Sequence, residues 1–87
     1  MDIINLLKSA RSDTELSELL KVLLSNNEHT LLNNRAQILA GLIQGSSYKQ
    51  IESHTGTSSA TISKINLRLH EASLTNLKKR LLKKSLS

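Results

Sequence analysis

Apolar side chains recur at intervals of three and four residues along most of the chain, which is the spacing of one face of an α-helix. No stretch alternates convincingly between apolar and polar positions at period two, so the pattern predicts no strands. The chain is therefore expected to be all-α, with helices over residues 2–12, 13–24, 25–44, 48–55, 59–72 and 74–86.

Residues that can satisfy free backbone groups mark several of the predicted helix ends. Asp13 is suited to cap the second helix, and Ser25 with Glu28 forms a Ser-x-x-Glu pair at the start of the third. Gly45 is expected to end that third helix, because glycine accepts the left-handed backbone conformation common at helix C-termini. Ser73 is suited to cap the last helix.

The second predicted helix carries apolar side chains on most of its circumference. A helix that is apolar on most sides is buried on most sides. In a chain of 87 residues a second copy of the chain is the expected cover, because so small a domain with almost no aromatic area has a thin core. The side chains concerned are Leu16, Leu19, Leu20, Val22, Leu23 and Leu24.

Length and charge narrow the class of protein. The 87 residues correspond to a single domain, residues 1–87. Lysine and arginine number 12 against 7 aspartate and glutamate, and this net charge of +5 suggests a polyanionic partner, with an ordinary charged surface as the alternative. No apolar run approaches the roughly 20 residues that span a membrane. No signal peptide follows Met1, so we expect a cytoplasmic protein with no membrane partner.

Residues 47–70 have the pattern of a helix-turn-helix motif, in which a tight turn joins two short helices. Gly56 can adopt a positive φ, so it can end the first helix and turn the chain sharply. Ser58 is suited to cap the second helix. The side chains expected between the two helices and the rest of the domain are Ile51, Thr55, Ile62 and Ile65.

The second helix of this motif opens with small and hydroxyl-bearing residues and continues into basic ones, which suits a helix that lies in the major groove of DNA. Ser59 and Ala60 are expected to face base edges. The alternative is a structural helical hairpin with a solvated outer face. The residues expected to contact phosphate oxygens are Lys49, Thr61, Ser63, Lys64 and Arg68.

The sequence holds no arrangement typical of catalysis or of metal binding. His29, His54 and His70 are scattered and there is no cysteine, so we expect no metal ion. No nucleophile, base and acid occur together, and no glycine-rich phosphate loop is present, so the chain is not expected to be an enzyme.

On these residues the chain resembles the Trp repressor superfamily, from about Asn5 onward. Residues 19–28, LLKVLLSNNE, are similar to the second helix of that family and the start of its third. Arg35 stands where the family carries an arginine, and residues 56–64, GTSSATISK, are similar to the segment that reads DNA. The spacing from Gly45 to Gly56 agrees with the shorter relatives that have no known corepressor.

The resemblance implies a six-helix chain of Trp repressor type that forms an intertwined homodimer. Its two helix-turn-helix units would enter successive major grooves of a near-palindromic operator, roughly one helical turn apart. The implied function is that of a sequence-specific, DNA-binding transcriptional regulator, a dimeric repressor whose partner is double-stranded DNA.

In the members that respond to tryptophan, a ligand lies beside the DNA-reading helix. Carried onto this chain, the resemblance implies a corepressor site made by Val22, Ser25, Arg35 and Lys64. Lys64 replaces an arginine of that set, and lysine lacks the planar fork that grips a carboxylate. Ile65 replaces a glycine, and its side chain would occupy much of the ligand's volume. These departures argue against L-tryptophan as a corepressor.

Two other functions remain compatible with the sequence. The chain could be a helical protein-interaction module, with its basic end and leucine faces against an acidic protein. It could also be the DNA-binding accessory of a transposition system. Salt-dependent binding to duplex DNA separates the protein-interaction module from the DNA-binding functions.

Overall fold

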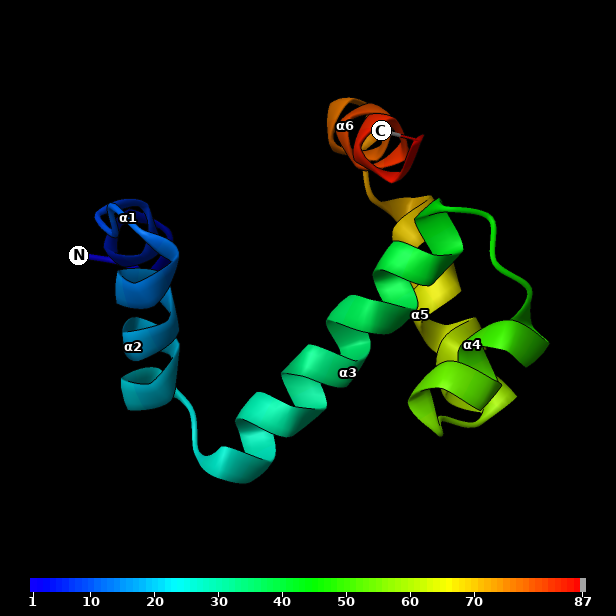
Figure 1. Ribbon diagram of the computed structural model, residues 1–87, viewed down its shortest axis with the longest axis horizontal. Coiled ribbons are helices and arrows are strands. Elements are labelled where there is room, and N and C mark those ends of the chain that lie inside the picture. The colour runs from blue at the N-terminus through cyan, green and yellow to red at the C-terminus, as the bar shows by residue number, and fades with distance from the viewer. Residues whose placement is uncertain (87) are drawn as a thin grey trace. The chain divides into compact units, whose positions relative to one another are not determined.

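The computed structural model describes the backbone of residues 1–86 and the side chains of residues 1–83. This part of the chain is all-helical, as predicted (Figure 1). The chain divides into two compact units, Met1–Leu32 and Asn33–Ser87, and the third helix passes from one into the other. The helices are α1 (Ile3–Lys8), α2 (Asp13–Leu23), α3 (Asn26–Ile43), α4 (Tyr48–Thr55), α5 (Ser59–Glu71) and α6 (Thr75–Leu86).

The first helix is shorter than predicted, because Ser12, near its predicted end, caps the second helix instead. α1 ends at Lys8, where the Ser9 hydroxyl donates a hydrogen bond of 2.6 Å to the Leu6 carbonyl. Ser12, which was expected inside this helix, has an extended backbone, with φ −151° and ψ 162°. That conformation points its hydroxyl at the start of α2, so the prediction of a helix through residue 12 is wrong.

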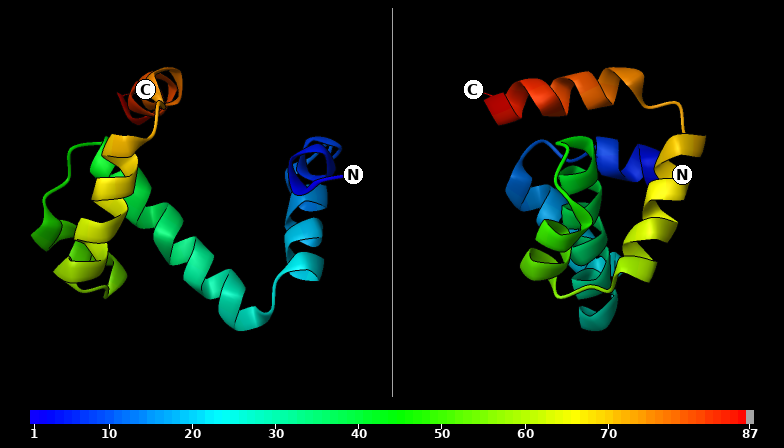
Figure 2. Two further views of the ribbon diagram at one scale, coloured as in Figure 1. Left: turned by 180° about the vertical axis from the view of Figure 1, so that it is seen from behind. Right: turned by 90° about the vertical axis from the view of Figure 1, so that its right-hand side faces the viewer.

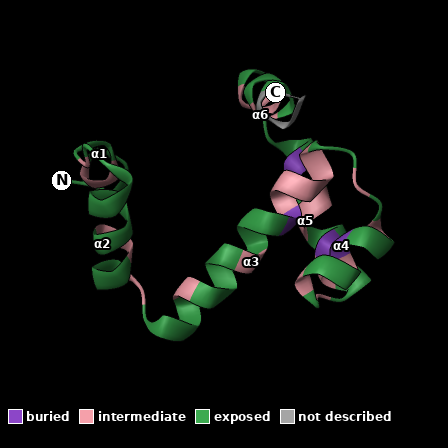
Figure 3. Ribbon diagram, viewed as in Figure 1, coloured by how far each residue is buried: buried purple, intermediate pink, exposed green. Residues whose placement is uncertain are grey.

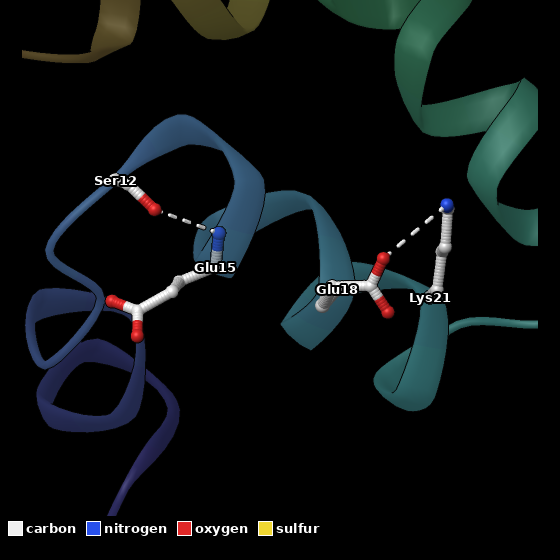
Figure 4. Close-up of polar contacts among 4 residues, drawn as sticks. All are labelled: Ser12, Glu15, Glu18 and Lys21. Atoms are coloured by element: carbon white, nitrogen blue, oxygen red, sulfur yellow. Dashed lines mark hydrogen bonds and ion pairs between the residues drawn. The ribbon is translucent and has the colours of Figure 1, made fainter.

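The cap of α2 is Ser12 and not Asp13. The Ser12 hydroxyl accepts a hydrogen bond of 3.1 Å from the backbone N–H of Glu15 (Figure 4). The carboxylate of Glu15 in turn accepts one of 2.7 Å from the N–H of Arg11. Asp13 becomes the first helical residue, where its negative charge is stabilised by the helix dipole.

The predicted Ser-x-x-Glu pair at the start of α3 is confirmed. The backbone N–H of Ser25 donates to Glu28 Oε1 at 2.9 Å, and the N–H of Glu28 donates to Ser25 Oγ at 3.2 Å. Hydrogen bonding from Ser25 to the carboxylate, chiefly from the Ser25 backbone N–H, lowers the pKa of the Glu28 carboxyl, because it favours the charged form.

Residues 1–32, all of which the structure describes, contain no buried side chain (Figure 3). Val22 is 84 % exposed and Leu23 43 % exposed, although both are apolar. The ion pair of α2, between Lys21 Nζ and Glu18 Oε1 at 3.6 Å, lies in solvent and contributes little to stability (Figure 4). The unit is therefore a set of capped helices without an interior of its own.

The unit of residues 33–87 has a small interior, because α4 and α5 lie beside the C-terminal half of α3 (Figures 1 and 2). Ile38, Ile51 and Ile62 meet there and are at most 3 % exposed. Gly41 on α3 allows this approach, since a Cβ at that position would stand 3.1 Å from Ile51 Cγ1. The half-buried side chains packed around this isoleucine cluster are Leu42, Tyr48 and Ile65.

The remaining helix ends follow the sequence, with one exception. Gly45, at φ 83°, comes shortly after the end of α3, as predicted. α6 begins at Thr75, because the first helical hydrogen bond runs from the N–H of Lys78 to the Leu74 carbonyl at 2.8 Å. Ser73 is thus one residue short of the cap position, and the prediction that it caps a helix starting at Leu74 is wrong.

Candidate nucleic-acid interface

The first helix of the motif, α4, begins at a reciprocal cap and ends at the glycine that the sequence indicated. Ser47 and Gln50 form a reciprocal cap, with hydrogen bonds of 2.8 Å and 3.1 Å between backbone N–H groups and side-chain oxygens. Gly56 ends the helix with φ 71°, and its N–H donates to the Glu52 carbonyl at 2.8 Å. A residue with a Cβ would be strained at this φ, so glycine is required for the turn.

The turn into α5 is held by hydroxyl groups. The Thr55 hydroxyl donates to the Ile51 carbonyl at 2.7 Å and accepts from the N–H of Thr57 at 3.3 Å. Ser58 caps α5, as predicted, with its Oγ 3.4 Å from the N–H of Thr61 and 3.3 Å from the Thr61 hydroxyl. These hydrogen bonds fix the conformation of the short turn that joins the two helices of the motif.

The inner face of the motif is the one predicted. Ile51 and Ile62 are buried, and Thr55 and Ile65 are half-buried. On α5 the residues at positions 62, 65 and 69 follow the helical repeat, and Leu69 is also buried, at 6 % exposure. Because this face of α5 packs toward the interior, the opposite side of its N-terminal half is exposed to solvent.

That outer side carries the small and basic residues. Ser59 and Ser63 are one helical turn apart and exposed, as are Ala60 and Lys64. Arg68 continues the same face one turn further. The face presents hydroxyls, one methyl group and two cations, which are groups that contact bases and phosphates in DNA.

Two of the predicted phosphate contacts lie elsewhere on the motif. Lys49 is exposed on α4, beside the start of that helix. Thr61 is half-buried, and its hydroxyl is shared with the Ser58 cap. Glu52, the one acidic residue between Ser47 and His70 in the sequence, is half-buried on α4.

The four residues suggested for a corepressor are divided between the two units. Val22 and Ser25 belong to residues 1–32, and the Ser25 side chain is committed to the α3 cap. Arg35 and Lys64 belong to residues 33–87, and both are exposed. Ile65, which would border the ligand, packs against the isoleucine cluster.

An open pocket of about 480 Å³ lies between α3 and α4, on the C-terminal unit. None of the four suggested corepressor residues borders it. Its polar side chains are glutamine, serine, threonine and histidine, with no lysine or arginine among the lining residues. The lining residues are Gln37, Ala40, Gly41, Gln44, Ser46, Gln50, Ile51, His54 and Thr55.

Sequence reasoning missed one polar contact in the motif. The side-chain amide of Asn66 on α5 donates to the Tyr48 hydroxyl on α4 at 3.1 Å. The ring of Tyr48 also packs against the isoleucine cluster. The only signal in the sequence was an aromatic hydroxyl and an amide on the inner sides of two neighbouring helices, which is too common to single out.

This arrangement defines an all-α protein of the helix-turn-helix class, with a small, basic outer face on the second helix of the motif. The chain matches the family model described as Trp repressor protein over residues 1–85, and it belongs to this family. Membership indicates a DNA-binding regulator and does not suggest an enzyme. Comparisons with curated proteins and with solved structures returned no match. Among the described helices, none combines the length and apolar character that crossing a membrane requires.

Proposed function

We propose that the protein is a transcriptional repressor that binds DNA as a homodimer and blocks a promoter by occupying a near-palindromic operator. The observation that carries this proposal is the outer face of α5, where Ser59, Ala60, Ser63 and Lys64 are exposed above a buried isoleucine interior. A helix with small residues at its N-terminal end can enter the major groove closely, and its N-terminus faces the bases.

In this proposal the contacts divide into two kinds. Ser59 and Ala60 meet base edges, with the Ala60 methyl against a thymine methyl. Lys64, Ser63 and Arg68 contact phosphates, which fix the register of the protein on the duplex. Thr61 and Lys49 contact phosphates as well, Lys49 from α4.

The dimer is supported by the surface of residues 1–32. This unit has no buried side chain, and Val22 is 84 % exposed. Each apolar side chain that moves from water into an interface contributes about 1.5–3 kcal/mol. Intertwining of two chains would cover this surface. The large apolar residues left exposed in this unit are Met1, Ile3, Ile4, Leu16, Val22, Leu23, Leu31 and Leu32.

We further propose that the repressor does not require L-tryptophan. Ile65 already fills space against the isoleucine cluster, so the side of α5 that would border a ligand is occupied by the chain itself. Lys64 can attract a carboxylate but cannot hold it with two parallel hydrogen bonds. Calorimetry with L-tryptophan should give no binding at micromolar concentration, and binding at that level would overturn this part of the proposal.

Selection of bound sequences from a random DNA pool tests the proposed function. We expect enriched sites with two related halves, roughly one helical turn apart. A double variant, Ser63→Glu with Lys64→Glu, should abolish the shift of the selected duplex, because it places two negative charges against phosphates. Lys8→Glu on α1 is the control for charge reversal. A pool without enrichment, or a double variant that binds like the unaltered chain, would overturn the proposal.

A further inference from the structure

One hydrogen bond joins the two helices of the motif at a distance from the turn. It runs from Asn66 Nδ2 on α5 to Tyr48 Oη on α4, over 3.1 Å, and is partly buried. Every other side-chain hydrogen bond in the described part of the chain links residues at most four positions apart. Among the described residues, the Tyr48–Asn66 bond is therefore the one side-chain hydrogen bond that joins segments distant in the sequence.

This hydrogen bond lies where it can restrict the angle between α4 and α5. Tyr48 is the first residue of α4, the end farthest from the turn at Gly56. Asn66 lies in the second half of α5, also away from the turn. The covalent turn joins the two helices at one end and the hydrogen bond joins them toward the other, with Ile51 and Ile62 packed between.

A hydrogen bond restricts this angle in a way that the isoleucine contacts do not. Apolar burial is non-directional, so isoleucine side chains tolerate small rotations of one helix against the other. A hydrogen bond weakens steeply when its donor and acceptor leave their preferred distance and angle. The Tyr48–Asn66 pair is satisfied only over a narrow range of angles between α4 and α5.

We propose that the Tyr48–Asn66 hydrogen bond fixes the angle between α4 and α5, and that both residues are positioning residues for base discrimination by α5. The inference rests on the proposed DNA-binding function. Base contacts from Ser59 and Ala60 depend on accurate placement of the start of α5, whereas a phosphate contact from Lys64 tolerates small shifts, because its charge sits on a flexible stem. Loss of the bond therefore lowers affinity for the specific site and leaves affinity for other duplexes nearly unchanged.

Tyr48→Phe is the sharpest variant, because it removes the hydroxyl and keeps the ring that packs on the isoleucine cluster. We compare the full chain with Tyr48→Phe, Asn66→Ala and the double variant, measuring the ratio of affinities for the selected duplex and a scrambled duplex at one salt concentration. Each single variant should lower this ratio roughly 3- to 10-fold, the effect of one hydrogen bond. The double variant should lower it no further than the worse single one, because both changes remove the same contact.

Asn76→Ala on α6 is the matched control, since Asn76 is an exposed helix asparagine. It should leave the ratio unchanged. Equal ratios for Tyr48→Phe and the unaltered chain overturn the inference and leave the proposed function standing. An unaltered chain that binds no duplex overturns the proposed function, and with it the role of this bond in base discrimination.

A second measurement tests the bond without DNA. The side-chain amide protons of Asn66, observed by NMR, should exchange more slowly than those of Asn76 and should lose this protection in Tyr48→Phe. Asn66 protons that exchange at the same rate with and without the Tyr48 hydroxyl would show that the bond is absent in solution, which overturns the inference whatever the DNA results are.

Discussion

The two units of this chain use the same devices to form helices and differ in what they do with the apolar side chains. In residues 1–32, the Ser12 and Ser25 hydroxyls accept capping hydrogen bonds, as those of Ser47 and Ser58 do in residues 33–87. Among the described residues, only the second unit has buried side chains, and its interior is centred on three isoleucines. The first unit leaves Val22 and other large apolar residues exposed to solvent. Helix formation and core formation are thus separate properties in this protein.

The difference has a consequence for stability. Short helices are marginal in water, and most of their stability comes from packing an apolar face. The unit of residues 33–87 has such packing within one chain. The unit of residues 1–32 has half-buried leucines but no buried side chain, so we expect its helices to depend on a second chain.

The largest effect should come from the interior that exists in one chain. Ile62→Ala removes a side chain that is 0 % exposed. It should lower the free energy of unfolding by about 2–5 kcal/mol per chain, because of lost burial and a residual cavity. Leu67→Ala, on the same helix at 62 % exposure, should cost much less in urea unfolding followed by circular dichroism. Equal losses would contradict the placement of the core.

A somewhat smaller effect should come from the surface that a partner is proposed to cover. Val22→Asp should cost almost nothing in an isolated chain, because this side chain is 84 % exposed. In the proposed dimer it should remove about 1.5–3 kcal/mol of apolar burial per chain. The added cost of burying a charge makes dissociation the expected result, as measured by sedimentation equilibrium. Ser17→Asp, exposed on the same helix, is the control. If Val22→Asp dimerises like the unaltered chain, the proposed interface is wrong.

The smallest effect concerns the cap where the first unit leads into α3. The hydrogen bonds from Ser25 lower the pKa of Glu28, so this carboxylate stabilises the folded state above the ordinary pKa of glutamate. That contribution should disappear as the pH falls from the ordinary pKa through the lowered one. Glu28→Gln keeps the capping geometry but cannot titrate. The difference in stability between the two chains should therefore change across this range alone, and a constant difference would contradict the assigned cause.

Local chemistry was readable from the sequence wherever one residue type was required. Gly56 and Gly45 take positive φ, and Ser58 and the Ser25–Glu28 pair occupy the helix ends expected of them. The sequence was ambiguous where neighbours could do the same task. Ser12 and Asp13 can both cap a helix, and the choice of Ser12 shortened α1 to residues 3–8.

By itself, the sequence determined six helices, the sharp turn at Gly56 and the small, basic outer side of α5, because each depends on residues close together in the chain. The tertiary structure decided that Ile38 meets Ile51 and Ile62 and that Tyr48 meets Asn66, because those contacts depend on how separate helices lie against one another. It also decided that residues 1–32 remain without an interior. An apolar pattern states which face a helix must cover, but only the packing of distant segments supplies the cover.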